Sequence, residues 1–415
     1  MRLLVLMTLL MLLLGLSGCG SRPAKDAATS SSGAKPQLVR DDLSRSLQQR
    51  ADSNSAFAQL DAYADDRGVG TWRRASGGSV VSSSGGPRLV SGDYAGRADV
   101  ERFIDRMQRQ GFQRGELVSV FSRVQRDPWI VKYMNRQWKP ASGPTGAWTR
   151  YRSKHITSNM LAKGDAFWNR HAATLDKAAR QYGVPPEYIV AIIGIETKWG
   201  GYMGKHRIVD ALSTLAFDYP RRADYFSDEL EQFLIMSRDQ GVDPFQPVGS
   251  FAGAMGLGQF MPSSYQKYAV DFDGNGNRNL WDAQDAIGSV ANYFNKHGWK
   301  NGQQVTARAA GGGGLPRSME TGFKTSYAVA DLESRGLRPA LSLPPDQRVS
   351  LLRLDAAGGY EYWLGFTNFY VITRYNRSTY YAMTVHQLAQ ALRARRGVRP
   401  AARVTQYAVA AEPAG

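Results

Sequence analysis

The stretch from residue 184 to residue 204 constrains the chain most, because it predicts a short helix bounded at both ends. It reads VPPEYIVAIIGIETKWGGYMG. Pro185 and Pro186 suit the first turn of a helix, where a missing N–H costs little. The Gly200-Gly201 pair predicts where the helix stops.

One side of this helix combines apolar residues with a carboxyl group. Ile189, Ile192, Ile193 and Glu196 recur at spacings of three and four, so they share a face. Burial and the negative end of the helix dipole both disfavour a carboxylate, so we expect a raised pKa for Glu196. A Glu that holds its proton near neutral pH can act as a general acid. The alternative is a last-turn residue that pairs with a Lys or Arg and is partly solvated.

The N-terminus predicts export and lipid attachment. Residues 1–18 are a basic start and an apolar run too short to span a bilayer comfortably, which is typical of a signal peptide. They lead into LSGC, which resembles a bacterial lipobox that ends at Cys19; the alternative is a plain secretory signal with an incidental Cys. Gly20 follows in place of the Asp that would retain a lipoprotein in the inner membrane. Because Cys19 is the only cysteine, an internal disulfide and a cysteine-based zinc site or nucleophile are excluded.

Composition and patterning divide the rest of the chain. Lys and Arg exceed Asp and Glu by 52 to 36, which favours acidic partners such as an anionic membrane, a polyanion or an acidic polymer. Residues 19–92 are rich in Ser, Gly and Ala and predict a flexible tether behind the lipidated Cys. The folded region is expected over 93–395, with a disordered tail over 396–415.

Periodicity predicts mostly helices with one β-rich segment. Apolar stripes at helical spacing begin at Ala98, and further helices are expected over 161–182, 224–239, 283–297 and 378–394. Between residues 303 and 372 the runs QVTARA, SLLRL, YEYWLGF and FYVITRY predict strands.

A short polar run has the ligand spacing of an EF-hand-like loop. Oxygen ligands fall at positions 1, 3, 5, 7, 9 and 12, with Gly at position 6 for the turn. They are Asp271, Asp273, Asn275, Asn277 (through its backbone carbonyl), Asn279 and Asp282. The spacing predicts a structural Ca²⁺ or Na⁺ ion, weakened because Asp282 replaces the usual Glu. The alternative is a polar turn without an ion.

Three further runs are suited to a sugar ligand. GSFAGAMGLGQFMPSSY (249–265) combines glycines with Ser250 and Gln259, DYPRRADYF (218–226) places Arg221 and Arg222 beside aromatic rings, and FYVITRYNRSTYY (369–381) crowds aromatics around an Asn. Taken singly, the first is also compatible with a packed turn and the second with a solvated helix start.

Together these runs resemble the membrane-bound lytic murein transglycosylase B family over about residues 92–392. The resemblance implies a mainly α (α+β) fold. Its parts would be an N-terminal helical lobe (about 96–145), a lysozyme-like catalytic core (about 146–302 and 373–395), a small β subdomain (about 303–372) and the EF-hand-like loop.

The resemblance also implies roles for individual residues. Glu196 would be the single catalytic acid/base, Ser250 and Gln259 would orient it and the sugar, and Arg221 and Arg222 would meet the peptide stem or lactyl region. The residues lining the groove would be Tyr151, Tyr293, Tyr375, Asn376 and Tyr381.

The implied reaction cleaves the bond between N-acetylmuramic acid and N-acetylglucosamine and leaves a 1,6-anhydromuramyl end, without a catalytic cofactor. A hydrolytic muramidase stays open, with Asp210, Asp218 or Asp224 as a second carboxylate. So does a non-catalytic peptidoglycan tether. Expected partners are glycan strands and the outer membrane, on its periplasmic side, with peptidoglycan synthases and division proteins as protein candidates; no nucleic acid is expected.

Overall fold

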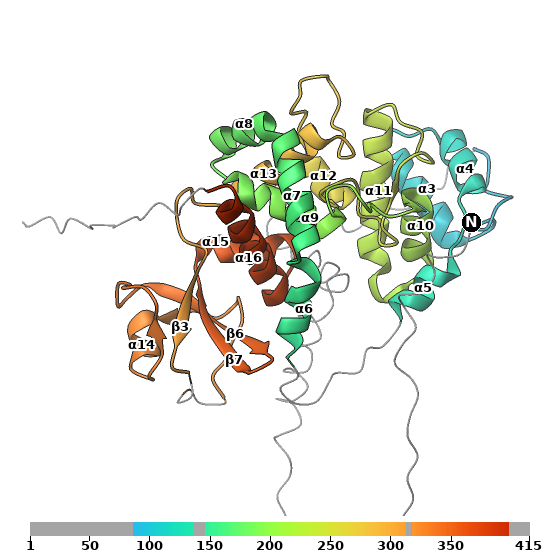
Figure 1. The fold of residues 1–415 in the computed structure, drawn as a ribbon. Coiled ribbons are helices and arrows are strands. Elements are labelled where there is room, and N and C mark those ends of the chain that lie inside the picture. The colour runs from blue at the N-terminus through green and yellow to red at the C-terminus, as the bar shows by residue number, and fades with distance from the viewer. Residues whose placement is uncertain (1–85, 136–145, 313–314, 316–317, 398–415) are drawn as a thin grey trace, which may run out of the picture. The chain divides into compact units, whose positions relative to one another are not determined.

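The computed structural model describes residues 86–135, 146–312, 315 and 318–397, all within the compact unit of residues 45–415. The signal peptide, Cys19, most of the predicted tether and most of the tail lie outside these residues. The helices (Figure 1) are α3 (Ala98–Gln108), α4 (Arg114–Arg123), α5 (Pro128–Met134), α6 (Ala147–His155), α7 (Ser158–Arg170), α8 (Ala172–Tyr182), α9 (Pro186–Thr197), α10 (Ile208–Asp218), η2 (Pro220–Arg222), α11 (Ala223–Asp239), α12 (Pro262–Tyr268), α13 (Ala283–Lys296), α14 (Val329–Glu333), α15 (Thr367–Tyr375) and α16 (Thr379–Arg395). The strands are β1 (His206–Arg207), β2 (Val248–Gly249), β3 (Thr306–Ala310), β4 (Tyr327–Ala328), β5 (Arg338–Pro339), β6 (Arg348–Ala356) and β7 (Gly359–Gly365).

Helix α9 is the centre of the helical core. It packs against α7, α8, α13 and α16, and every residue from Glu187 to Gly194 is buried. A helix that is apolar on all sides must be covered on all sides, so the other helices surround it. The predicted apolar stripe is therefore part of a wider buried surface.

The end of α9 is an unusual backbone turn. The helix ends at Thr197, and Lys198 and Trp199 follow with φ of 54° and 58°, so left-handed backbone begins before the predicted Gly200-Gly201 stop. Such a conformation costs a non-glycine residue about 1–3 kcal/mol. The Trp199 indole N–H donates to the Val190 carbonyl at 3.0 Å, and its ring covers Gly194, where an added Cβ would lie 2.3 Å from the ring. This packing holds the strained turn in place.

The β subdomain is an antiparallel sheet with the strand order β4-β6-β7-β3-β5. In its central hairpin, Leu351 pairs with Leu364 and Leu352 with Trp363. Leu351 and Leu364 face a small core closed by α14, whereas Leu352 joins the main core. The sheet is therefore attached to the helices through the face opposite α14 (Figure 1).

Two predicted elements differ from the structure. The run FYVITRY, predicted as a strand, is helix α15, so the sheet ends at Gly365. Its β-branched and aromatic residues favour strands only weakly, and burial of Phe369, Ile372 and Tyr375 on one helical face overrides that preference. The helix predicted over 161–182 is two helices, because His171 breaks it with φ −113° and ψ 23°.

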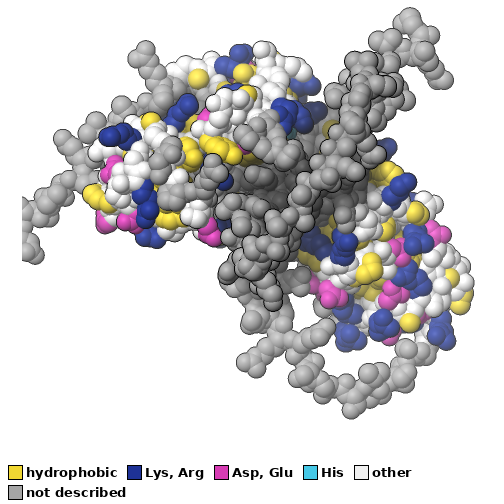
Figure 2. All heavy atoms as spheres, turned by 90° about the horizontal axis from the view of Figure 1, so that it is seen from below, with side chains coloured by type: hydrophobic (Ala, Val, Ile, Leu, Met, Phe, Trp, Pro, Cys, Tyr) yellow, Lys and Arg dark blue, Asp and Glu magenta, His cyan; other side chains and the backbone are white. Residues whose placement is uncertain are grey.

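The surface carries mixed charge. On the face drawn in Figure 2, Lys and Arg side chains are interspersed with acidic and apolar ones. Within the described ranges, no helix has both the length and the apolar character needed to cross a membrane.

A partly buried polar contact joins α9 to α16. The Tyr188 hydroxyl lies 2.9 Å from His386 Nδ1, and the Gln390 side-chain amide donates to the same hydroxyl at 3.2 Å. Burial lowers the pKa of His386 to about 4. The ring is therefore neutral in the folded protein at neutral pH.

We predict that His386 makes the fold less stable in acid. Between pH 6.5 and about 4 the unfolded chain binds a proton at this ring and the folded protein does not, so the free energy of unfolding falls as the pH is lowered through this window. His386→Asn keeps an acceptor near Tyr188 and should remove up to about 3 kcal/mol of that loss. Urea denaturation of both proteins across this pH window measures the free energy of unfolding. The same pH dependence in the two proteins would contradict the prediction.

Candidate active site

Glu196 meets a tyrosine from the far end of the chain. It lies half-buried in the last turn of α9, and the Tyr381 hydroxyl of α16 donates a hydrogen bond to its Oε1 at 2.6 Å. Tyr381 is wholly buried, and burial followed by the charge of Glu196 raises its pKa well above its ordinary value. The phenol therefore remains a donor that orients the carboxyl group.

The residue after Glu196 fastens the glycine-rich loop to the helix. The Thr197 hydroxyl lies 3.1 Å from the Ile193 carbonyl and 3.0 Å from the Leu257 carbonyl, and it accepts the Gly200 N–H at 3.1 Å. The loop over residues 249–261 is thus held next to the carboxyl group. No sequence pattern predicts this role, since a Thr at a helix end has many uses.

Ser250 and Gln259 both organise that loop. The Ser250 hydroxyl accepts the N–H groups of Ala252 and Ala254 at 3.3 and 3.0 Å. Gln259 is nearly buried and has a left-handed φ of 52°. Its amide nitrogen donates to the carbonyls of Gly256 and Met203 at 2.9 and 3.3 Å. The structure therefore assigns both side chains contacts within the protein that fix the loop's shape.

Two of the predicted groove residues lie near Tyr381, and a third is buried after α15. Tyr151 and Tyr375 are close enough to influence its pKa electrostatically. The Tyr375 hydroxyl donates to the Gly258 carbonyl at 2.5 Å, which ties α15 to the glycine-rich loop. Asn376 is wholly buried directly after α15.

Tyr293 is placed differently from the others. It is 5% exposed, stacks on His297 with ring centroids 4.0 Å apart, and donates to the Arg374 carbonyl at 2.6 Å. It contacts Tyr375 edge-on at 4.8 Å. Tyr293 thus packs behind the predicted groove residue Tyr375.

The two arginines of the DYPRRADYF run differ in exposure. Arg221 is exposed, whereas Arg222 is partly buried, with its guanidinium carbon 4.2 Å from the Tyr225 ring centroid and 5.5 Å from that of Phe226. The predicted pairing of guanidinium and aromatic faces is confirmed for Arg222. Its two terminal nitrogens are buried and have no hydrogen-bond partner among the described residues. Such donors suit a carboxylate ligand.

The aspartates considered as a second catalytic carboxylate have other contacts. Asp218 pairs with Arg97 and Arg126, each at 2.6 Å. Asp210 pairs with Arg207 at 2.5 Å and accepts the Gln125 N–H at 2.9 Å. These contacts attach the loop after α4 and the start of α3 to α10. Asp224 is exposed in the first turn of α11.

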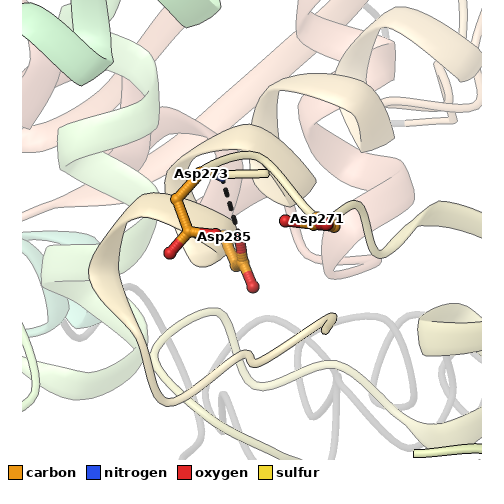
Figure 3. Close-up of side chains that lie close together, drawn as sticks. All are labelled: Asp271, Asp273 and Asp285. Atoms are coloured by element: carbon orange, nitrogen blue, oxygen red, sulfur yellow. Dashed lines mark hydrogen bonds between the residues drawn. The ribbon is translucent and has the colours of Figure 1, made fainter. Parts of the chain in front are cut away.

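Three carboxyl groups meet at the predicted ion loop. Asp271, Asp273 and Asp285 each offer an oxygen, and these oxygens lie within 4.8 Å of one another (Figure 3). Ca²⁺–O bonds are about 2.3–2.6 Å, so oxygens bound to one ion lie within about 5 Å of each other. Asp271 accepts the N–H groups of Gly274, Asn275 and Gly276, as a turn around an ion requires. The donor set therefore fits a hard cation.

The structure places a carboxyl group other than that of Asp282 beside Asp271 and Asp273. Asp282, predicted at position 12, caps α13 by accepting the Gln284 N–H at 2.7 Å, while Asp285 joins the other two carboxyls. Asp285 is wholly buried and accepts N–H groups from Phe272 and Asn279, each at 2.7 Å. One sequence signal could have indicated Asp285. It is an acidic residue within the apolar pattern of α13, where burying a carboxylate is unfavourable unless it has partners.

Comparison with known proteins identifies the family. Residues 95–390 match the family model described as the transglycosylase SLT domain. The chain therefore belongs to the transglycosylase SLT domain family. This confirms the resemblance found in the sequence and the mainly helical fold with a lysozyme-like core.

Individual relatives are close in sequence and structure. The chain is 52% identical over 324 residues to membrane-bound lytic murein transglycosylase B of Escherichia coli (strain K12), covering 76% of this chain and 89% of the relative. It is similar, with a TM-score of 0.70 and 52% identity, to the Escherichia coli lytic transglycosylase SLT35 in complex with calcium, covering 74% of this chain and 96% of that one. SltB3 from Pseudomonas aeruginosa in complex with NAG-anhNAM-pentapeptide is 29% identical, with a TM-score of 0.61, over 71% of this chain and 79% of that one.

We predict that Tyr381→Phe lowers turnover of peptidoglycan, the substrate that the resemblance implies, by about 10- to 100-fold. A hydrogen bond to a charged group contributes about 1.5–3 kcal/mol, and its loss leaves the carboxyl group poorly oriented. Tyr380→Phe is the matched control, because that hydroxyl is 3.4 Å from the Asp355 amide nitrogen. Release of soluble muropeptides measures both variants, and equal rates for the two would contradict the role of Tyr381.

Proposed function

We propose that the chain is a peptidoglycan lytic transglycosylase with Glu196 as its single acid/base. The observation that carries the proposal is the contact between Glu196 and Tyr381 at the end of a buried helix. Family membership and 52% identity to a lytic murein transglycosylase support the substrate class. The bond cleaved is the β-1,4 bond between N-acetylmuramic acid and N-acetylglucosamine.

The proposed reaction uses one carboxyl group twice. Glu196 first protonates the leaving glycosidic oxygen as the bond to the muramyl C1 breaks. The resulting carboxylate then takes the proton of the muramyl C6 hydroxyl, whose oxygen attacks C1 and closes a 1,6-anhydro ring. Glu196 regains its proton in this step. Because water is not consumed, the product is lighter by one water than a hydrolysis product.

The proposed pathway needs only one carboxyl group, whereas hydrolysis commonly uses two. An internal hydroxyl has a high effective concentration once the sugar ring is positioned. The ion pairs of Asp210 and Asp218 occupy two of the three alternatives. The NAG-anhNAM-pentapeptide bound to the relative SltB3 supports an anhydro product here.

The remaining site residues are proposed to hold the substrate. Ser250 and Gln259 shape the loop beside Glu196 and present it to the sugar. Tyr151 and Tyr375 would line the groove, with Tyr293, Asn376 and Tyr381 supporting it from behind. Arg221 and Arg222 would bind carboxylates of the peptide stem; the unpartnered buried nitrogens of Arg222 support this role.

We also propose that the enzyme works from the outer membrane, facing the periplasm. Lipidation at Cys19 and a tether over residues 19–92 would let a catalytic region over 93–395 reach the glycan strands. The lipobox-like LSGC run and the relative's name, membrane-bound, support this arrangement.

A structural Ca²⁺ is proposed in the loop after α12. Asp271, Asp273, Asn275, the Asn277 carbonyl and Asp285 would hold it, and the calcium bound to the relative SLT35 supports the ion's identity. When bound, the ion supplies positive charge that offsets the three gathered carboxylates. It takes no part in the proton transfers.

The first test of this function is mass spectrometry of muropeptides released from sacculi by protein that lacks the signal and Cys19. We expect anhydromuramyl ends, and Glu196→Gln should lower their release by about 10²- to 10⁴-fold while binding persists. Glu187→Gln is the control on the same helix, since Glu187 pairs with Arg393 at 3.3 Å. Reducing-end products would indicate a muramidase, and sedimentation without products would indicate a binding tether.

The ion site predicts different results for two neighbouring aspartates. Asp285→Asn should weaken Ca²⁺ binding by about tenfold or more and reduce the thermal stabilisation that Ca²⁺ gives, because a buried carboxylate ligand loses its charge. Asp282→Asn should bind Ca²⁺ normally, since Asn also caps a helix. Isothermal titration with CaCl₂, and thermal melting with and without chelator, measure both variants. Weaker Ca²⁺ binding in Asp282→Asn than in Asp285→Asn would contradict this prediction and support the predicted twelve-residue loop.

A further inference from the structure

Glu229 is a buried carboxylate outside the predicted site. It lies in the middle of α11 and is 3% exposed. Its Oε2 accepts the Ser263 N–H at 2.8 Å, and its Oε1 accepts the Ser263 hydroxyl at 2.7 Å. Burial raises the pKa of Glu229, while the two Ser263 contacts act in the opposite direction. Burying a carboxylate costs desolvation energy that an apolar residue would avoid. The hydrogen bonds to Ser263 offset part of that cost, so a role for them is expected.

The two contacts fix one end of the loop that carries Gln259. Ser263 lies in the first turn of α12, whose N-cap residue Met261 makes no side-chain capping bond. Glu229 therefore supplies this cap from another helix. Without it, the Ser263 N–H loses its acceptor and the start of α12 loses its fixed position.

The loop between these anchors needs firm support. Met255 and Phe260 exchange backbone hydrogen bonds of 2.8 and 3.1 Å, and the turn between them includes Gln259 in its left-handed conformation. Strained backbone persists only where its surroundings hold it from several sides. Thr197 holds the loop at Leu257, beside Glu196, and Glu229 holds it at Ser263. Gln259 lies between these two attachments in the chain.

We propose that Glu229 is a positioning residue for the transglycosylase reaction, acting through Ser263 to keep Gln259 aligned with Glu196 and the sugar. This inference rests on the proposed function. Glu229 is 3% exposed and bonds Ser263, so its effect on the reaction is indirect. Its removal should therefore affect the rate of the chemical step more than substrate binding, since a misplacement of about 1 Å near a reacting centre costs about 10²-fold in rate.

The test is steady-state kinetics on soluble, uncrosslinked glycan strands. Glu229→Ala should lower kcat by about 10- to 100-fold with KM changed by less than about threefold. Glu229→Gln should restore most of kcat, because its amide has the same shape and can bond both Ser263 groups. The matched control is Glu231→Ala on the same helix, since Glu231 pairs with Arg106 at 3.0 Å and should leave kcat within about twofold of wild type.

Ser263→Ala provides an independent measurement if Glu229→Ala fails to fold. It removes one of the two contacts and should give a smaller fall in kcat. Adding Ser263→Ala to Glu229→Ala should then cost nothing further, because the two residues act as one unit. Additive effects, or normal kcat in Ser263→Ala, would overturn the proposal.

The outcomes separate this inference from the proposed function. A wild-type protein that releases no anhydromuramyl product refutes the function and this inference with it. An active wild type beside a Glu229→Ala variant with unchanged kcat, or with a loss confined to KM, refutes the positioning role alone. A fall in kcat equal to that of Glu231→Ala also refutes it, since a general loss of helix stability would explain both.

Discussion

Burial of the apolar helix α9 is the constraint on which the rest of the structure depends. Because the helix is covered on all sides, its last turn brings the half-buried Glu196 to the edge of the interior, where protein side chains can orient its carboxyl group. The hydroxyl of Tyr381, 185 residues later in the chain, performs that task. The packing of α16 on α9 therefore stabilises the core and also builds the site.

The surroundings of Glu196 are held by contacts between elements far apart in sequence. Thr197 joins the helix to the glycine-rich loop, Tyr375 joins α15 to the same loop, and Glu229 joins α11 to its far end. Each contact goes to a backbone group of the loop or of α12. A side chain that bonds backbone fixes the path of the chain itself, which is what a strained loop requires. The site is thus a rigid frame around one carboxyl group.

Helix positions and the family could be predicted because periodicity and ordered motifs are local properties, whereas the catalytic role of Glu196 stays a prediction. The predicted helices over 224–239, 283–297 and 378–394 agree with α11, α13 and α16 within two residues. FYVITRY was predicted wrongly because strand propensity is weak and tertiary packing decided the outcome. Asp285 was not predicted beside Asp271 and Asp273, because it lies inside α13, three positions beyond Asp282, and only the fold brings it there. Thr197 and Glu229 have no pattern in the sequence, since their partners lie in a distant segment.

The short edge strands of the β subdomain limit pairing between neighbouring copies of the protein. Both edge strands, β4 and β5, are two residues long, and β5 consists of Arg338 and Pro339. An exposed strand edge is a template for pairing with another chain, and short length, a charged side chain and proline each discourage such pairing. Proteins anchored to a membrane meet each other at high local concentration in two dimensions. On a chain anchored as proposed, β4 and β5 would each offer a neighbouring copy only two residues of edge strand to pair with.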